Sequence, residues 1–157
     1  MIDLNKIKIA IGISPIVAVT LFLKVNPAFA GYTGSLEVKF NGLNNSQGQV
    51  CANLFNGQRG FPDGGSSAAI KVASCAPIKK GTAVITFANL PYGNYAISAI
   101  HDIIGDRKLH SNFFGIPTGG VGFSNNPTVV TSAPGFNDAQ FFVSGSKTEL
   151  LIKMQYF

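Results

Sequence analysis

Turn-forming residues divide the chain into short segments, and this division constrains the fold more than any other feature. From residue 31 onward, Gly, Pro, Asn and Asp recur at intervals of about eight to twelve residues, which is the spacing of an all-β sandwich or barrel. Between these turns, apolar and polar residues alternate, as they do along a strand with one buried face. We therefore predict a single antiparallel β-sandwich of about seven or eight strands.

The alternation also locates the strands along the sequence. It covers residues 34–41, 50–54, 70–75, 82–87, 95–100, 139–143 and 149–156, with a short further candidate at 128–132. The connection between Asp102 and Asn126 has no regular pattern. A connection of this length inside a domain is usually functional, or it contains structure that the pattern does not reveal. We expect it to form the functional surface of the protein.

Residues 1–30 have the three parts of a secretory signal peptide. Lys6 and Lys8 give a positively charged start, residues 9–23 are uncharged, and residues 28–30 read Ala-Phe-Ala, a typical cleavage motif. The alternative is an uncleaved membrane anchor. A membrane-spanning helix needs about 20 apolar residues, whereas this stretch is shorter and contains a proline. We predict that the segment is a signal peptide and is removed.

The mature protein is then one secreted domain, residues 31–157, in the periplasm or outside the cell, with no membrane span. Removal of the signal peptide lowers the formal charge from +5 to +3, because three lysines and one aspartate leave with it. Hydrophobic residues make up 46% of the chain, which excludes intrinsic disorder. The 12 Lys and Arg residues form no cluster longer than Lys79-Lys80, so we predict no nucleic acid partner. We expect a monomer.

The two cysteines, Cys51 and Cys75, both lie in the mature part. Oxidising compartments favour disulfides, so export predicts a disulfide between them. The alternative is a pair of buried free thiols. A metal site built on the two cysteines would need further ligands, and neither His101 nor His110 is near them in the sequence.

Three motifs follow one another in the second half of the chain. The first is Leu90-Pro91-Tyr92-Gly93-Asn94-Tyr95-Ala96, and the second is His101-Asp102. The third supplies a set of candidate site residues: Gly115, Ile116, Pro117, Gly122, Phe123, Ser124, Asn125 and Asn126. Together with Phe136-Asn137-Asp138-Ala139, these motifs resemble an exported bacterial family known as domain of unknown function 2141. The resemblance extends over residues 34–157.

The resemblance implies the family's fold and an exported bacterial protein. It implies no activity, because none is established for the family. The first motif also resembles prealbumin-like sandwiches, such as the carboxypeptidase regulatory-type and Cna B-type domains. This second resemblance implies a prealbumin-like, Ig-like sandwich that serves as a binding, stalk or accessory module.

The resemblance further implies a small cation-binding loop after His-Asp, and this sequence departs from that pattern. Asp102 and Asp106 are present. However, Ile104 and His110 stand where oxygen ligands are typical of the family, and Arg107 replaces the turn glycine. Ca²⁺ prefers oxygen ligands, which isoleucine lacks, and a nearby arginine opposes cation binding. The family's loop is therefore degraded in this chain.

Four residues of this region are the best candidates for a metal site: His101, Asp102, Asp106 and His110, with Asn112 nearby. Two imidazoles and two carboxylates suit Zn²⁺, Cu²⁺ or Ni²⁺ better than Ca²⁺. The alternative is structural, because loop aspartates commonly accept hydrogen bonds from the backbone of their own loop. In that case His101 caps the end of a strand. We favour the structural role and predict no cofactor, with a divalent metal as the alternative.

Catalytic motifs are scarce in this chain. A hydrolase would pair His101 or His110 with Ser111 or Ser124, but the residues around Ser124 do not form the Gly-x-Ser-x-Gly turn of such enzymes. The glycine-rich stretch 60–65 lacks the Gly-Lys-Ser/Thr ending of a phosphate-binding loop. We therefore predict that the protein is not an enzyme, with a secreted hydrolase as the less favoured alternative.

Three phenylalanines, Phe113, Phe114 and Phe123, lie in the long connection. They either form an exposed patch for a partner or fold back to cap the core. We expect the second arrangement, because large apolar side chains are usually buried. The sequence as a whole predicts a non-catalytic binding or structural module of the bacterial cell envelope, whose partner is an envelope protein or a glycan. A metal-binding protein is the alternative function.

Overall fold

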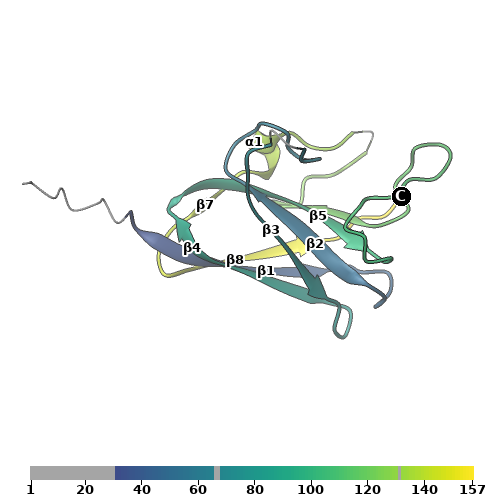
Figure 1. Cartoon of the computed structure of the whole chain (residues 1–157), viewed down its shortest axis with the longest axis horizontal. Helices are drawn as coiled ribbons and strands as arrows, with labels where there is room; N and C mark the ends of the chain where they lie inside the picture. The colour runs from purple at the N-terminus through teal and green to yellow at the C-terminus, as the bar shows by residue number, and fades with distance from the viewer. Residues whose placement is uncertain (1–30, 66–67, 131) are drawn as a thin grey trace, which may run out of the picture. The chain divides into compact units, whose positions relative to one another are not determined.

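Two β-sheets face each other in the described part of the chain, which comprises residues 31–65, 68–130 and 132–157 of this computed structural model (Figure 1). The predicted signal peptide, residues 1–30, lies outside the described residues. The elements are β1 (Thr33–Asn41), β2 (Gln49–Phe55), β3 (Ile70–Pro77), β4 (Ala83–Pro91), β5 (Gly93–Asp102), β6 (Val121–Phe123), α1 (Phe136–Ala139), β7 (Phe141–Val143) and β8 (Lys147–Lys153). The all-β sandwich that the alternation predicts is confirmed.

The two sheets are organised around β1 and β5. In the smaller sheet, β1 lies between β4, to which it is antiparallel, and β8, to which it is parallel. The larger sheet has the order β3-β2-β5-β6, and β7 pairs with the first residues of β5. The C-terminal half of β5 has a neighbour on each side, because it pairs with β2 up to Asp102 and with β6 at residues 98–100. The long connection starts from this end, directly after His101 and Asp102.

The core between the sheets comes from the inward-facing residues of the alternating strands. Leu36, Val38 and Phe40 of β1 are completely buried, as are Val50 and Leu54 of β2 in the facing sheet. Each side chain of this size stabilises the fold by about 1.5–3 kcal/mol when it is fully buried. A shift of register by one residue would turn such a row toward solvent, so the alternation also specifies how the strands pair.

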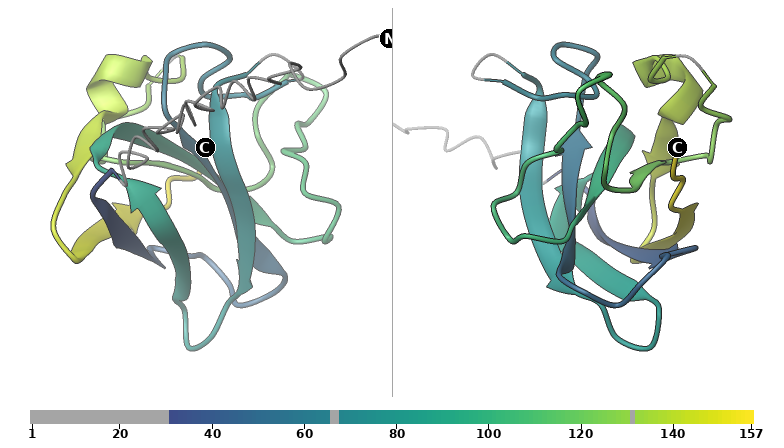
Figure 2. Two further views of the ribbon diagram at one scale, coloured as in Figure 1. Left: turned by 60° about the vertical axis from the view of Figure 1, so that its left-hand side comes forward. Right: turned by 90° about the vertical axis from the view of Figure 1, so that its right-hand side faces the viewer.

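A second apolar cluster covers part of the outer face of the larger sheet. Its buried members are Ala96, Val121, Phe123 and Ala139. Phe61 packs edge-on against the rings of Phe55 and Phe136, with centroids 5.1 and 5.8 Å apart. The loop after β2 and helix α1 therefore lie over this half of the outer face (Figure 2).

Three details of the strand prediction are wrong. The described residues of the expected strand at 128–132 form no strand, and β6 lies instead within the connection that we expected to be irregular. The alternation of apolar and polar residues does not reveal β6, because the central residue of this strand is a glycine, Gly122. A Cβ atom at this position would lie 2.8 Å from Met154 Sδ and 2.9 Å from Ile152 Cγ2. Ala139, which we expected to begin a strand, ends α1.

Cys51 and Cys75 form the predicted disulfide. They stand directly opposite each other on β2 and β3, and β3 is the edge strand of the larger sheet. The bond therefore fixes an edge strand, which has a neighbour on one side only, to the centre of its sheet.

Replacement of both cysteines, Cys51→Ser with Cys75→Ser, is expected to lower the free energy of unfolding by about 3.5 kcal/mol. The physical reason is the loss of a covalent link across 24 residues, which constrains the unfolded chain. Urea denaturation of the oxidised protein and of the double variant measures the difference. Addition of a reductant should destabilise only the wild type, and equal unfolding midpoints for the two oxidised samples would contradict the prediction.

Candidate functional site

His101 is a buried residue on the inner face of β5 and is only 2% exposed. Its Nε2 atom lies 2.8 Å from the carbonyl oxygen of Gln47, which can only accept, so Nε2 carries the hydrogen. Its Nδ1 atom lies 2.8 Å from the hydroxyl of Tyr156 and accepts from it. The Tyr156 hydroxyl in turn accepts from the backbone N–H of Asn44 at 3.2 Å. Both ring nitrogens of His101 are therefore occupied.

Tyr156 is suited to this donor role. Burial raises the pKa of the Tyr156 hydroxyl above its ordinary value, and the hydrogen bond from Asn44 opposes this rise only in part. The hydroxyl thus keeps the proton that it donates to His101. The side chain of His101 connects the end of β5 to the C-terminal segment and to the loop before β2, which is a structural role.

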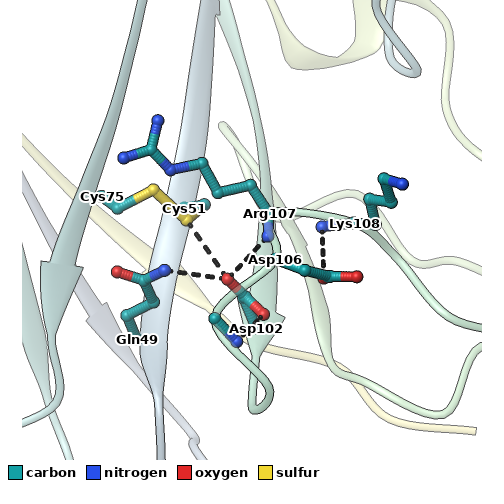
Figure 3. Close-up of a disulfide and its surroundings, with 8 residues drawn as sticks. Gln49, Cys51, Cys75, Asp102, Asp106, Arg107 and Lys108 are labelled. Atoms are coloured by element: carbon teal, nitrogen blue, oxygen red, sulfur yellow. Dashed lines mark hydrogen bonds between the residues drawn. A yellow bond between two sulfur atoms is a disulfide. The ribbon is translucent and has the colours of Figure 1, made fainter.

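Asp102 points to the other side of the sheet, because successive residues of a strand face in opposite directions. Figure 3 shows its carboxylate between Gln49 Nε2, a donor at 2.8 Å, and the N–H of Arg107, a donor at 3.0 Å. The N–H of Gly105 also donates to this carboxylate, at 2.7 Å. Cys51 Sγ lies 3.9 Å from the same carboxylate. A disulfide sulfur has no hydrogen to donate, so this is a contact and not a hydrogen bond.

The carboxylate of Asp102 is only 1% exposed, yet its environment favours the ionised form. Burial by itself would raise the pKa of Asp102. The hydrogen bonds from Gln49 and from the backbone N–H groups of Gly105, Arg107 and Asp106 outweigh burial, and the pKa of Asp102 lies below its ordinary value. The carboxylate is therefore an acceptor that organises the start of the loop.

Asp106 and His110 form a separate pair on the surface. Asp106 Oδ2 lies 2.8 Å from His110 Nε2, and the other oxygen of Asp106 accepts from the N–H of Lys108 at 3.0 Å. The two side chains are 36% and 47% exposed.

The structure does not bring the four predicted metal ligands together. His101 faces the core, Asp102 faces its own loop, and only Asp106 and His110 are in contact. Across the described ranges, no group of three or more His, Cys, Asp or Glu side chains is placed to hold a metal ion. The neighbouring residue Asn112 uses its side-chain oxygen to accept from the N–H groups of Phe114 and Ile116, at 3.0 Å each.

The Phe-Ser-Asn-Asn part of the third motif, residues 123–126, connects strands and helix. Ser124 is completely buried; its hydroxyl donates to the carbonyl of Ala139 and accepts from the N–H of Ile97 at 2.9 Å. The Asn125 side chain donates to the carbonyl of Gln140 at 2.7 Å. These contacts fix α1 to the larger sheet, so we assign the residues a structural role.

Asn126 acts on the edge of the smaller sheet. Its side-chain amide donates to the carbonyl of Leu151 at 2.9 Å, and its oxygen accepts from the N–H of Lys153 at 2.7 Å. Both partners belong to β8, an edge strand. Asn126 therefore satisfies backbone groups that an edge strand would otherwise expose.

The expectation that all three phenylalanines cap the core is wrong for two of them. Phe123 is buried, at 5% exposed, whereas Phe113 and Phe114 are 97% and 82% exposed. The difference follows from the backbone, because Phe123 lies in β6 over the second apolar cluster. Phe113 and Phe114 lie in a turn, outside any strand.

A groove with a volume of about 1200 Å³ lies on the open half of the outer face of the larger sheet. Outward-facing residues of β2, β3 and β5 line it, including the disulfide, Asn53 and Ile100. Loop residues 107–109 and 114–117 line it as well, and this loop stands beside β2 and β3 in the right-hand view of Figure 2. Gly115, Ile116 and Pro117 of the third motif thus belong to the groove.

The lining of the groove is largely apolar, with a cationic part. Several apolar side chains of the lining are exposed: Leu109, Phe114, Ile116, Val130 and Phe157. Arg107 and Lys108 contribute positive charge, and Figure 3 shows the Arg107 side chain extending beside the disulfide. Asp63 is the one carboxylate among the described lining residues.

Sequence reasoning missed Val130, Phe157 and Asn53 as parts of this site. They come from three distant segments, and only the folded sheet brings them to one groove. Alternation does reveal that Asn53 faces outward. No local signal identifies Val130 or Phe157.

Comparisons with known proteins give a family and nothing more specific. Residues 38–150 match the model of a family described as "Uncharacterized protein conserved in bacteria (DUF2141)". No curated protein and no solved structure matches the chain. In the described part of the chain, no helix has the length and apolar character needed to cross a membrane.

The stability of the fold is expected to depend on the charge of Asp102. Because the folded-state pKa is lowered, the ionised carboxylate stabilises the protein above its ordinary pKa of 3.8, and this contribution is lost as the pH falls through the folded value. At pH 7, Asp102→Asn should cost about 1–3 kcal/mol, because buried donors lose their partner. Urea denaturation from pH 7 down to pH 3 measures both effects.

Asp63→Asn is the control for this series, because Asp63 is exposed. It should leave the free energy of unfolding nearly unchanged at pH 7. If Asp102→Asn had the same acid-induced loss of stability as the wild type, Asp102 would not be its source.

Micromolar Zn²⁺ is expected to leave the melting temperature unchanged, because only two of the predicted ligands, Asp106 and His110, are in contact. Tight zinc sites use three or four protein ligands. Differential scanning fluorimetry with Zn²⁺, Cu²⁺ and Ni²⁺ tests this, with His110→Ala as the matched variant. A melting temperature that rises by several degrees in the wild type but not in His110→Ala would show that a metal site exists.

Proposed function

This chain belongs to the DUF2141 family of uncharacterised bacterial proteins, and we propose that it is a non-catalytic binding module of the bacterial cell envelope. In this proposal, the groove on the larger sheet holds an apolar segment of another envelope protein.

The observation that carries the proposal is the open half of the larger sheet. The outer face of a sandwich is usually either polar or covered. Here the groove exceeds the ~300–1,000 Å³ that is typical of small-molecule sites. Its exposed side chains include Ile116 at 43%, Val130 at 77% and Phe157 at 54%. Exposed apolar residues that gather around one concavity are typical of a surface that a partner covers.

The chemistry of the lining favours a protein segment over a glycan. Leu109, Ile116 and Val130 present aliphatic groups that match apolar side chains. Sugars instead need a dense set of hydrogen-bonding groups. Ser98, a polar residue of the lining, already donates its hydroxyl hydrogen to the carbonyl of Pro62 at 2.8 Å.

The non-catalytic part of the proposal rests on two of the four residues that a hydrolase would use, His101 and Ser124. Both ring nitrogens of His101 are occupied, and the ring faces the core. The hydroxyl of Ser124 is engaged with two backbone groups and is completely buried. Neither residue presents a reactive atom to the groove.

The location in the envelope rests on the sequence. The pattern of residues 1–30 is typical of the signal peptides of exported proteins, and the Cys51–Cys75 disulfide suits an oxidising compartment. Fractionation of cells that produce the full chain tests this directly.

Site-specific photo-cross-linking tests the proposed groove. A benzophenone amino acid at Asn53, inside the groove, is expected to form an adduct with an envelope protein. The same amino acid at Thr86, which is exposed on β4 of the other sheet, should not. The reagent reacts only with groups within a few ångströms, so the adduct reports contact with the groove.

A matched pair of substitutions gives the control. Ile116→Asp should reduce the adduct at least about tenfold, because a central apolar contact is worth about 2 kcal/mol or more. Val84→Asp, at a similarly exposed apolar position on the other sheet, should not reduce it. Equal adducts from both faces would contradict the proposal, and an adduct removed by glycan-degrading enzymes would assign the groove to a glycan.

A further inference from the structure

Exposed apolar side chains are concentrated in one loop. Of the fourteen large apolar side chains that are exposed in the described part of the chain, six belong to residues 103–116, here called the loop tip. They are Ile103, Ile104, Leu109, Phe113, Phe114 and Ile116. Single exposed apolar residues are ordinary on protein surfaces, whereas exposed apolar side chains that gather together are typical of interaction sites. The rings of Phe113 and Phe114 pack edge-on against each other, with centroids 5.5 Å apart.

The turn at residues 112–116 leaves the two phenylalanines exposed. Asn112 closes this turn with several hydrogen bonds. Its side-chain oxygen accepts from the N–H groups of Phe114 and Ile116, and its own N–H donates to the carbonyl of Ile116 at 2.9 Å. The N–H of Gly115, a residue with a φ of +77°, donates to the Asn112 carbonyl at 2.9 Å. The turn is therefore held by local contacts, without burial of either ring.

Positive charges accompany these apolar residues. Arg107 and Lys108 are exposed, and the backbone of Arg107 is fixed by Asp102. The nearby carboxylate of Asp106 is already in contact with His110. The loop tip thus combines exposed rings, aliphatic side chains and two cations that are neighbours in the sequence and whose side chains extend in different directions (Figure 3).

We propose that the loop tip docks on the surface of an anionic lipid bilayer. Phe113, Phe114 and Ile104 would enter the boundary between headgroups and acyl chains, where amphipathic and aromatic side chains gather. Arg107 and Lys108 would face the negative headgroups, which attract basic residues within about one Debye length. A bilayer matches this combination because it offers an apolar layer directly beneath a layer of negative charge.

A protein partner would match the loop tip less well. Protein interfaces bury their hot spots in shaped pockets within flat or concave surfaces. Phe113 instead is 97% exposed at a protruding turn and is not part of the groove lining. Leu109, Phe114, Ile116 and the two cations also line the groove, whereas Phe113 and Ile104 lie outside its lining, so the two surfaces overlap in part. Vesicles that contain no protein partner test the loop tip by itself, and each of the two proposals can therefore fail without the other.

The lack of tryptophan in the chain permits a clean measurement. Phe113→Trp places one fluorophore at the proposed point of insertion. On vesicles of phosphatidylcholine with about one-third phosphatidylglycerol, which supplies the negative surface, we expect a blue shift of its emission and quenching by brominated acyl chains. Phe142→Trp is the matched control, because Phe142 is a phenylalanine 57% exposed on β7, which pairs with the opposite end of β5. It should show neither effect.

Cosedimentation with the same vesicles measures the contributions of the two kinds of residue. Phe113→Ser with Phe114→Ser should weaken binding at least about tenfold, as expected for the loss of two buried rings. Arg107→Gln with Lys108→Gln should weaken it about fivefold per charge and reduce its dependence on salt. Arg59→Gln with Lys71→Gln, two exposed cations away from the loop, should have little effect.

The outcomes separate the possibilities. Binding that needs both phosphatidylglycerol and the phenylalanines supports the proposal. The proposal is overturned if the emission of the Phe113→Trp variant does not shift, if binding to vesicles of pure phosphatidylcholine is equally strong, or if the double serine variant binds unchanged. A benzophenone amino acid at Phe113, which lies outside the groove lining, would also overturn it by forming an adduct with a protein in place of lipid. The vesicle measurements contain no groove partner.

Discussion

The buried carboxylate of Asp102 determines the direction in which the long connection leaves the sheet. An ionised carboxylate that is 1% exposed is very costly unless donors surround it. Gln49 supplies one donor from β2, and the N–H groups of Gly105 and Arg107 supply two from the loop. The chain must therefore curl back over the end of β5. This curl places residues 107–109 beside the disulfide, where they line the groove, and leaves the loop tip exposed.

His101 and Asp102 make their contacts on opposite faces of the larger sheet. Consecutive strand residues point in opposite directions, so His101 reaches the core side and Asp102 the outer side. The first secures the C-terminal segment through Tyr156, and the second secures the loop. This arrangement also explains why the two residues do not share a metal ion. The strand period already implies the separation, since it places adjacent side chains on different faces.

The sequence predicted those parts of the fold that burial on one face specifies. The strands β1, β4 and β8 alternate clearly, because one side of each faces the core and the other faces solvent. β6 was missed because it is three residues long and is centred on Gly122, which must be small beside Met154. The disulfide followed from compartment chemistry alone. The groove did not, because its lining comes from segments whose proximity depends on the complete topology.

Phe113 and Phe114 show when the general preference of large apolar side chains for burial fails to predict their exposure. The preference assumes that a large apolar side chain can reach the core, but here hydrogen bonds around Asn112 close the turn before either ring can fold back. Asn112 and Gly115 account for the shape of this turn, and neither ring is buried against the body of the protein. The stability of the fold therefore does not require phenylalanine at these two positions. The stability of the fold does not need these two rings, yet a turn with several hydrogen bonds keeps them exposed. Contacts with something outside the molecule best explain why the rings are there.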